Sequence, residues 1–396
     1  MAQAAYIVSA ARTPMGKFGG SLRELSAPDL GVIATRAALE RAGVNAGEVE
    51  EVIFGCGRQA GSGPNLARQI AYRALGPAIG QAVPALTVNQ ACASGLQSIA
   101  LAAERIALGR AHCLLVGGTE SMSRLPYFLE GARWGLKMGH QRLTDAMYRD
   151  GFLCPLSEMV MGETAEVLAD EYNITRDQQD RYAHRSHQRA ARAWQEGRFR
   201  DEVVPVEVRE KKSTRLLEQD ETFRPDASPE KLAKLAPVFK QDGSVSAGNS
   251  SQLTDGAAAL LVVSEEKLKQ WGLMPLARVV DWVTVGCDPR RMGLGPVPAV
   301  ERLLEKTGER LEAFDLVELN EAFAVQVLAC DHDLHFDHQR LNVNGGAIAL
   351  GHPIGCSGAR IVTTLVHEMQ RRKSKKGLAT LCVSGGLGMA LSLERP

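Results

Sequence analysis

Two cysteines, a histidine and an asparagine each lie where a strand-like run gives way to a loop of small residues. Cys92 lies in VNQACASGLQS, Asn320 in VELNEAFA, His352 in GGAIALGHPIGCSG and Cys382 in TLCVSGGLG. A thiolate is a strong nucleophile, and a second thiol or an imidazole can move protons during catalysis. Together these residue types suit thioester chemistry, with one thiol as nucleophile and the other as acid or base.

Each of the four residues also has an ordinary structural explanation. Cys92 precedes a helix predicted over residues 94–109, whose free N–H groups and dipole favour a thiolate and lower the pKa of the thiol. Packing is the alternative, because free cysteine is among the most buried residue types. Taken singly, His352 fits a histidine satisfied in a turn, Asn320 fits a helix N-cap and Cys382 fits a core cysteine. Their common placement is what favours chemistry.

The elements that must hold these residues form two similar segments. The segment from Ala85 and the segment from Arg340 each contain a short strand ending in Val-Asn, a small-residue loop, a Ser-Gly that opens a helix, an apolar strand and a Gly-Gly turn. Such self-similarity indicates two copies of one α/β unit. Strand ends and helix starts of such units meet at one crevice, so we expect the four residues to share it.

The two copies differ by an insertion. LATLCVSGGLGMALSLE in the second copy predicts a β-hairpin, whereas the strand HCLLVGG of the first copy meets its partner, GAAALLVVS, only at Gly256. Residues 119–255 are therefore predicted to be inserted, and within them Thr175 and Gln178 form a capping box that starts a helix. Long insertions on a rigid scaffold usually carry binding, so we expect substrate recognition there. The predicted division is residues 1–118 with 256–276 as the N-terminal half, 119–255 as the insertion and 277–396 as the C-terminal half.

Composition excludes several classes of protein. The 396 residues carry 46 basic and 46 acidic side chains, a balance that argues against nucleic acid as the main partner. The apolar runs are shorter than the roughly 20 residues of a membrane span, so we expect no membrane insertion. The eight cysteines contain no C-x-x-C pair, which argues against disulfides or a zinc cage. Without a secretory or peroxisomal signal, a cytoplasmic location is expected.

One histidine cluster resembles a metal site only superficially. CDHDLHFDHQ contains His332, His335 and His338, but their spacing fits neither a pair on one helix face nor a zinc finger. We interpret this stretch as a polar helix exit on the surface and expect no metal.

Four motifs carry a resemblance to a known family. NQACASG, NEAFA, GGAIALGHPIGCSGAR and CVSGGLG, in this order and at these separations, resemble the signature motifs of the thiolases. MGETAE, GRFRDEVVPV, SAGNSSQLTDGAAA and MGLGPVPA match as well, so the resemblance covers essentially the whole chain. It implies an α/β fold of duplicated βαβαβαββ halves packed as α-β-α-β-α layers, with a large inserted loop domain. It also implies a homodimer or a homotetramer, joined in the second case through the basic segment from Arg124 to Arg142.

The resemblance also implies roles for individual residues. Cys92 resembles the acyl-carrying nucleophile, His352 the base that activates it, and Cys382 the base that removes a proton from the α-carbon of a second acyl-CoA. Asn320 resembles the residue that orders a water, which forms one oxyanion hole with His352. The N–H groups of Cys92 and Ser384 would form the other. The family more often has glycine at position 384, so the conformation of this turn is an open question.

Contacts with coenzyme A follow from the same resemblance. Methionine and phenylalanine are also ordinary core residues, and an arginine can be only a surface charge, so these assignments have structural alternatives. Val160 stands where short-chain members usually carry histidine, which leaves strict acetyl specificity open. The implied contacts are Arg224 near the adenine, Leu235 and Phe239 as apolar contacts, Ala247 and Ser251 along the pantetheine arm, and Met161, Met292 and Phe323 around the acyl group.

The implied reaction is the reversible Claisen condensation of two acetyl-CoA molecules to acetoacetyl-CoA and coenzyme A, through an acyl-Cys92 intermediate. No cofactor is implied, because the coenzyme A thioesters are substrates. A thiolase of fatty-acid β-oxidation that acts on longer 3-ketoacyl-CoA chains is the alternative within the family. A cysteine-protease type of hydrolase has the chain order Cys, His, Asn, whereas Asn320 here precedes His352. A non-catalytic acyl-CoA or lipid binding protein would be favoured only if one of the four residues had been lost.

Overall fold

The N-terminal half supplies five strands of a mixed sheet. The computed structural model describes residues 3–210 and 213–396. In this half β3 is parallel to β4 and β5, while β12 is antiparallel to β1 and β5, which gives the order β4-β3-β5-β12-β1. These strands are β1 (Ala5–Arg12), β3 (Glu51–Gly55), β4 (Ala85–Val88), β5 (Cys113–Ser121) and β12 (Thr254–Ser264), and a short β2 (Gly16–Lys17) pairs with β12.

The C-terminal half repeats this order. Its strands run β14-β15-β16-β13, and the predicted hairpin is confirmed as β15 paired antiparallel with β16. A single parallel bridge between Val317 and Leu341 places one more segment beside β14, where β4 lies beside β3 in the first half. The duplication expected from the sequence is therefore confirmed in the strand order. The strands are β13 (Ala277–Gly286), β14 (Leu316–Leu319), β15 (Lys376–Val383) and β16 (Leu387–Glu394).

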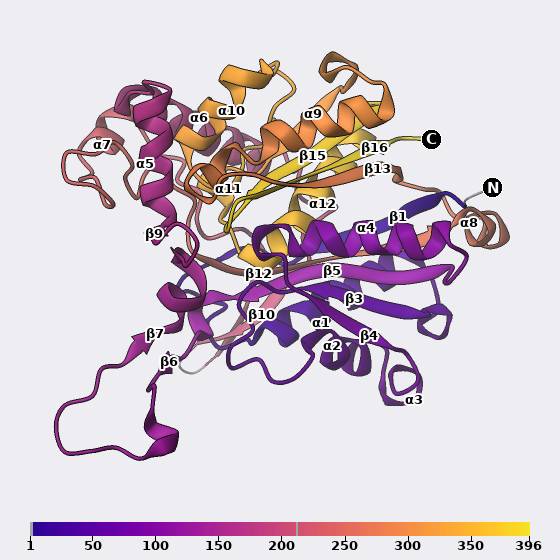
Figure 1. The fold of residues 1–396 in the computed structure, drawn as a ribbon. Coiled ribbons are helices and arrows are strands. Elements are labelled where there is room, and N and C mark those ends of the chain that lie inside the picture. The colour runs from indigo at the N-terminus through magenta and orange to yellow at the C-terminus, as the bar shows by residue number, and fades with distance from the viewer. Residues whose placement is uncertain (1–2, 211–212) are drawn as a thin grey trace.

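Helices form three layers around these strands. Two helices, α4 (Ser94–Ala107) and α12 (Ile354–Arg372), pack against each other between the strands of the two halves (Figure 1). The two sets of strands join where β1 and β13 pair at Ala5–Ile7, which makes one continuous sheet. The outer helices are α1 (Ala27–Ala42), α2 (Leu66–Ala74) and α3 (Pro77–Gly80) on the first half, and α9 (Pro296–Thr307) and α10 (Ala324–Leu334) on the second. This arrangement agrees with the predicted α-β-α-β-α layers.

Glycines allow the two central helices to approach closely. A Cβ added to Gly358 of α12 would lie 2.3 Å from the backbone nitrogen of Leu96 in α4, and one added to Gly95 would lie 2.7 Å from that of Ala359. Real Cβ atoms never approach a backbone atom so closely, so only glycine fits at these crossing points. The Ser-Gly that opens each helix is thus a packing feature that brings the two helix starts together.

The segment between β5 and β12 lies outside these layers. Ser121 pairs with Asp255, so the chain leaves and re-enters the sheet at adjacent positions. The predicted capping box is confirmed, with the Thr175 hydroxyl accepting from Gln178 N and the Gln178 amide oxygen accepting from Thr175 N at 2.7 Å. Its main elements are α5 (Met161–Glu171), α6 (Arg176–Gln195), β10 (Val206–Arg209), β11 (Thr214–Leu217) and α7 (Pro229–Ala233), with short strands at β6 (Tyr127–Phe128), β7 (Thr144–Asp145), β8 (Leu153–Cys154) and β9 (Met159–Val160).

Two further features complete the fold. Residues 129–143, between β6 and β7, extend away from the body of the molecule (Figure 1). The helix α10 ends at Leu334, and His335 follows in a left-handed conformation, which agrees with the predicted polar helix exit. Within residues 3–210 and 213–396, no helix combines the length and apolar character needed to cross a membrane. The remaining short helices are α8 (Glu265–Trp271) and α11 (Ala347–Leu350).

Candidate active site

Cys92 lies in a strained turn between β4 and α4. The residues Ala91–Ala93 form a 3₁₀ turn, η2, and Ala91 has a φ of 45°, a left-handed conformation that costs a non-glycine residue about 1–2 kcal/mol. The Ser94 hydroxyl stabilises the turn by accepting from Gln90 N at 2.9 Å and donating to Ala91 O at 2.6 Å. Cys92 therefore precedes the α-helix by a turn of its own.

Burial has a larger effect on the pKa of the Cys92 thiol than the nearby helix start has. The sequence predicts a lowered pKa, but loss of solvent raises the pKa of Cys92 above its ordinary value. The positive charge of Arg58 and the N–H groups of Ser384 and Cys92 act in the opposite direction without reversing the shift. The prediction of a lowered pKa is therefore wrong for the resting state, because a buried thiol loses the water that would stabilise its anion.

His352 is oriented by a serine that the sequence analysis missed. Its Nδ1 lies 2.5 Å from Ser357 Oγ, and that hydroxyl donates to Pro353 O at 3.1 Å. Since the hydroxyl proton is already used, Nδ1–H is the donor to Ser357 and Nε2 keeps its lone pair. Burial, together with the charges of Arg360 and Arg58, lowers the pKa of His352 to about 3. The imidazole is thus a neutral base.

Asn320 follows β14, and Cys382 lies near the end of the neighbouring parallel strand β15. Leu319 of β14 pairs with Thr380 of β15, so the two side chains lie at the same end of the sheet. Among the described residues, no group hydrogen-bonds either end of the fully buried Asn320 amide. Burial, reinforced by the charge at Cys92, raises the pKa of Cys382 well above its ordinary value. The N-cap explanation for Asn320 is wrong, because α10 begins only at Ala324.

Several contacts bring the four residues to one place. The turn η2 packs against both α12, which follows His352, and β15, which ends beside Cys382. On the other side, Ser251 N donates to Ala322 O at 2.9 Å, and His352 N donates to Gln252 O at 3.0 Å. Segment 249–252 therefore connects the loop after Asn320 to the loop that carries His352. These contacts bring together the elements that carry the four residues.

The Ser384 turn needs no unusual conformation at the serine. The positive φ angles fall on Gly385, at 91°, and Gly386, at 82°, whereas Ser384 has none. A side chain at position 384 therefore costs nothing in backbone strain. The backbone N–H groups of Ser384 and Cys92 both lower the pKa of the Cys92 thiol. This answers the question that the departure from glycine raised.

An apolar cavity of about 360 Å³ opens beside these groups. Of the four candidate catalytic residues, His352 is the one that lines it. Beside it lie Phe323, Met161, Phe239, Ala247 and Ser251, which the resemblance assigned to the acyl group or coenzyme A. Met292 does not line it and instead packs in the buried cluster behind it with Cys382 and Met161. Val160, noted in the sequence as a departure from histidine, also lines the cavity, together with apolar side chains that the sequence did not single out. These are Met122, Tyr148, Phe152, Val238 and Leu253, whose place in the inserted segment was their one signal, and Ile354, which lies outside that segment.

A second, more polar cavity of about 300 Å³ adjoins the first and shares Ala247 and Gln252 with it. Arg224 and Leu235 line it, together with His187, Asp226 and Lys231, which the sequence analysis missed. His187 is buried, and its Nδ1 accepts from Arg224 N at 3.1 Å. Burial, with the charges of Arg224 and His184, lowers the pKa of His187 to about 4. The pair of cavities suits a ligand with an apolar arm and a charged head.

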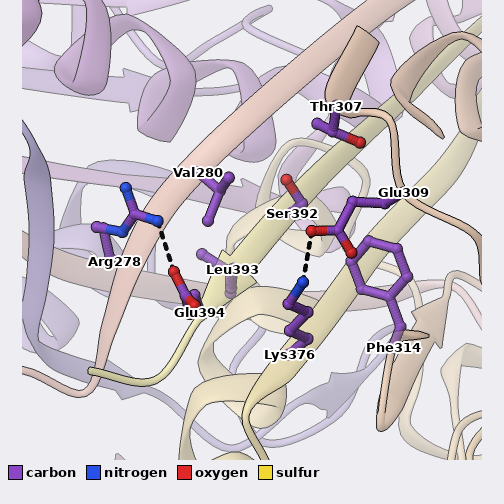
Figure 2. A pocket seen from close by; sticks show the side chains of 9 residues that line it. All are labelled: Arg278, Val280, Thr307, Glu309, Phe314, Lys376, Ser392, Leu393 and Glu394. Atoms are coloured by element: carbon purple, nitrogen blue, oxygen red, sulfur yellow. Dashed lines mark hydrogen bonds and ion pairs between the residues drawn. The ribbon is translucent and has the colours of Figure 1, made fainter. Parts of the chain in front are cut away.

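Another cavity, of about 160 Å³, lies at the opposite end of the same strands (Figure 2). Its charged groups are already paired, Arg278 with Glu394 and Lys376 with Glu309, each at 2.5 Å. Lys376 begins β15, the strand that ends beside Cys382. The cavity is thus remote from the crevice and offers no unpaired charge to a ligand.

Comparisons with known proteins agree with this geometry. The family model described as "Thiolase, N-terminal domain" matches residues 5–266, and "Thiolase, C-terminal domain" matches residues 273–395. The chain is 51% identical over 390 residues to an acetyl-CoA acetyltransferase of Pseudomonas aeruginosa, with 98% of each chain covered.

Two solved structures are also close. The Bacillus anthracis acetyl-CoA acetyltransferase has a TM-score of 0.97 and 44% identity, covering 100% of this chain and 99% of its own. The human mitochondrial 3-ketoacyl-CoA thiolase, in complex with CoA, has a TM-score of 0.95 and 42% identity, covering 100% and 98%. Because both family models and near-complete relatives match, the chain belongs to the thiolase family.

Proposed function

We propose that this thiolase catalyses the reversible Claisen condensation of two acetyl-CoA molecules to acetoacetyl-CoA and coenzyme A. The observation that carries the proposal is a neutral His352 with free Nε2 at the wall of an apolar cavity that adjoins a polar one, on elements that pack against those carrying Cys92 and Cys382. The relatives named acetyl-CoA acetyltransferase support the acetyl group as substrate. The CoA complex of the human thiolase supports coenzyme A as its carrier.

The first half-reaction forms an acyl-enzyme. His352 Nε2 takes the proton of the Cys92 thiol as the sulfur attacks the thioester carbonyl, and the same proton then leaves on the sulfur of coenzyme A. A neutral histidine suits this transfer, because a protonated one could not accept. The N–H groups of Cys92 and Ser384 would stabilise the tetrahedral oxyanion, and each such donor is typically worth about 10²- to 10³-fold in rate.

The second half-reaction forms the carbon–carbon bond. Cys382 passes its thiol proton to His352 Nε2 and then, as the thiolate, removes a proton from the methyl group of a second acetyl-CoA. The resulting enolate attacks the acyl carbon on Cys92, and the proton held by His352 passes to the Cys92 sulfur. The free buried amide of Asn320 is suited to fix a water which, with His352, would stabilise the enolate oxygen. The Cys92 sulfur leaves with the bonding electrons and recovers a proton. The sequence is redox-neutral, so we propose that it needs no metal or other cofactor.

We also propose that different segments of the chain have different roles. The two halves would supply the reacting groups, and residues 119–255 would bind coenzyme A. Arg224 and Lys231 at the polar cavity would face its phosphates, while Leu235 and Phe239 would contact its apolar parts. We propose a homotetramer, because residues 129–143 extend from the body and expose Trp134 and Met138 almost completely. We also propose that the enzyme acts in the cytoplasm.

The length of the acyl chain that the enzyme prefers is a separate part of the proposal. Val160 lines the acyl cavity, where an apolar side chain leaves room and offers no hydrogen bond. This preference is tested by measuring initial rates of thiolysis of acetoacetyl-CoA and 3-ketohexadecanoyl-CoA on one enzyme preparation. A higher kcat/KM for the C16 substrate would contradict the acetyl assignment in favour of β-oxidation.

Acylation and proton abstraction can be tested separately. Mixing with acetyl-CoA should give a covalent acetyl adduct on Cys92, detected by peptide mass spectrometry, and Cys92→Ser should remove it together with activity. Cys382→Ser should still acylate Cys92 but fail to exchange the methyl protons of acetyl-CoA for deuterium. An undiminished adduct on another residue, or normal exchange in Cys382→Ser, would contradict the assignment.

A further inference from the structure

A buried carboxylate and a buried guanidinium lie beside the nucleophile turn without a part in the steps above. Glu120, near the end of β5, is fully buried, and Arg58, in the loop after β3, is 7% exposed. Glu120 accepts hydrogen bonds from the backbone N–H groups of Gly57 at 2.9 Å, Arg58 at 3.1 Å and Gly355 at 2.8 Å. Since burying an ionised group is costly unless it is well bonded, such a cluster calls for a function.

Glu120 holds the loop of residues 56–58 against the start of α12. Gly355 lies in the first turn of α12, three residues after His352. On the other side, Cys56 N donates to Val88 O at 3.0 Å, and Asn89 Nδ2 donates to Gly57 O at 3.3 Å. The loop that carries Arg58 is thus fixed to the strand end that leads into Cys92 and to the helix that follows His352.

The Arg58 guanidinium bonds carbonyl oxygens and forms no direct ion pair with Glu120. Its guanidinium donates to two neutral acceptors, Gly57 O at 3.1 Å and Gly151 O at 2.9 Å. Within the part of the chain that the structure describes, Arg58 forms no ion pair, and its Nε has no hydrogen-bond partner. The Glu120 oxygens accept instead from three backbone N–H groups and from the Cys56 thiol, at 3.3 Å. A carboxylate on the guanidinium would cancel its field, whereas carbonyl oxygens leave that field to act on nearby groups.

The charged and titratable groups around Cys92 are Arg58, Glu120, Cys382 and His352. After burial, Arg58 has the largest effect on the pKa of Cys92 and lowers it, while Glu120 opposes it more weakly. Arg58 also lowers the pKa of His352, behind burial and Arg360, and so helps to keep the imidazole neutral. Arg58 is thus the leading charge that acts on the Cys92 thiol, whereas Arg360 acts more strongly than Arg58 on His352.

We propose that Arg58 is a positioning residue for the reaction: Glu120 fixes its loop so that an unpaired, buried positive charge stabilises the thiolate that forms at Cys92. The inference rests on the proposed function, in which Cys92 is the nucleophile. Arg58 acts through Cys92 and is not in contact with the reacting carbon. Its removal makes the thiolate harder to form without changing how the substrate binds.

Alkylation of Cys92 by iodoacetamide tests this without turnover. Its rate is measured between about pH 6 and 10, with the modified residue identified by peptide mass spectrometry, for wild type, Arg58→Met, Arg58→Gln and Arg58→Lys. In both neutral variants the profile should move to higher pH and the rate near pH 7 should fall roughly three- to tenfold, while Arg58→Lys should stay within about twofold of wild type. Arg181→Met, which removes an exposed arginine, is the matched control and should leave the profile unchanged.

A second variant displaces the Arg58 guanidinium without removing its charge. A Cβ added to Gly151 would lie 2.7 Å from Arg58 Nε, so Gly151→Ala displaces the guanidinium and should give a smaller shift in the same direction. Neutral variants that keep their circular dichroism and thermal unfolding but show the wild-type profile would overturn the proposal. If they do not fold, an unchanged profile in Gly151→Ala overturns it. Failure of the proposed function would instead show as the absence of an acetyl adduct on Cys92 in the wild-type protein.

Discussion

At the scale of single residues, the site is set by groups that orient other groups. Ser357 uses its hydroxyl proton on Pro353 O and thereby holds His352 with Nδ1 protonated and Nε2 free. Glu321 fixes the segment that precedes His352, because its carboxylate accepts from the Tyr182 hydroxyl at 2.9 Å and from Ile348 N at 3.2 Å. Residues of this kind often matter nearly as much as the groups they orient.

Ser357→Ala should therefore lower kcat roughly tenfold and change KM by less than about twofold, because the free imidazole loses its orientation while the cavities stay intact. Steady-state thiolysis of acetoacetyl-CoA measures both constants. Ser98→Ala is the control, since it removes an equally buried hydroxyl from α4 that bonds only Gly95 O and Gly117 O. An equal loss of kcat in both variants would show that Ser357 has no special relation to His352.

At the scale of elements, glycine contacts decide how closely the halves approach. Gly118 of β5 faces the start of α12, and a Cβ there would lie 2.1 Å from Gly355 O. No side chain can yield at such a contact, because the obstacle is backbone. The position of α12, which follows His352, thus depends on the lack of a side chain at Gly118, on a strand of the other half.

Gly118→Ala should destabilise the fold by about 1–3 kcal/mol and reduce activity further than stability alone explains, because α12 must move away together with His352. Urea unfolding and kcat/KM report the two effects. Gly286→Ala serves as the matched strand variant, since its added Cβ meets no atom within 4 Å. Equal unfolding midpoints for the two variants would refute the close-contact argument.

At the scale of the whole molecule, surface and charge are unevenly distributed. Residues 129–143 expose Trp134 at 87% and Met138 at 104% of their full area, although large apolar side chains on a protruding segment are costly in water. In the interior, histidines are held neutral, and Glu318 is buried beside Arg360, where burial raises the pKa of the carboxyl to about 8.

Trp134→Glu combined with Met138→Glu should convert the proposed tetramer to a dimer, because a charged segment cannot bury itself between dimers. Light scattering coupled to size exclusion gives the mass. Leu108→Glu alters an apolar residue that is 67% exposed elsewhere and should leave the mass unchanged. A tetramer that persists in the double variant would remove this segment from the interface.

Acid should destabilise the fold through His187. Its pKa is about 4 when folded and 6.5 when unfolded, so the unfolded chain binds the extra proton and stability falls as the pH drops from about 7 to 4. The loss for this group is on the order of 3 kcal/mol at pH 4. Glu318 has the opposite sign, since its raised folded pKa costs stability as the pH rises through about 8. Urea unfolding of wild type and His187→Gln across this range isolates the histidine, and parallel curves would contradict the prediction.

The sequence by itself determined the duplicated α/β fold, the β15–β16 hairpin and the helix start at Thr175, because strand periodicity, glycine turns and caps are local signals. It also named the four chemical groups, because a repeated pattern places each of them beside a loop of small residues. The tertiary structure decided the rest. Whether the Cys92 pKa rises or falls depends on burial and on Arg58, 34 positions away in the chain, and no local pattern encodes that balance. Ser357, Glu120 and His187 acquired their partners only when distant segments met, because hydrogen bonds and lost solvent belong to the packed state.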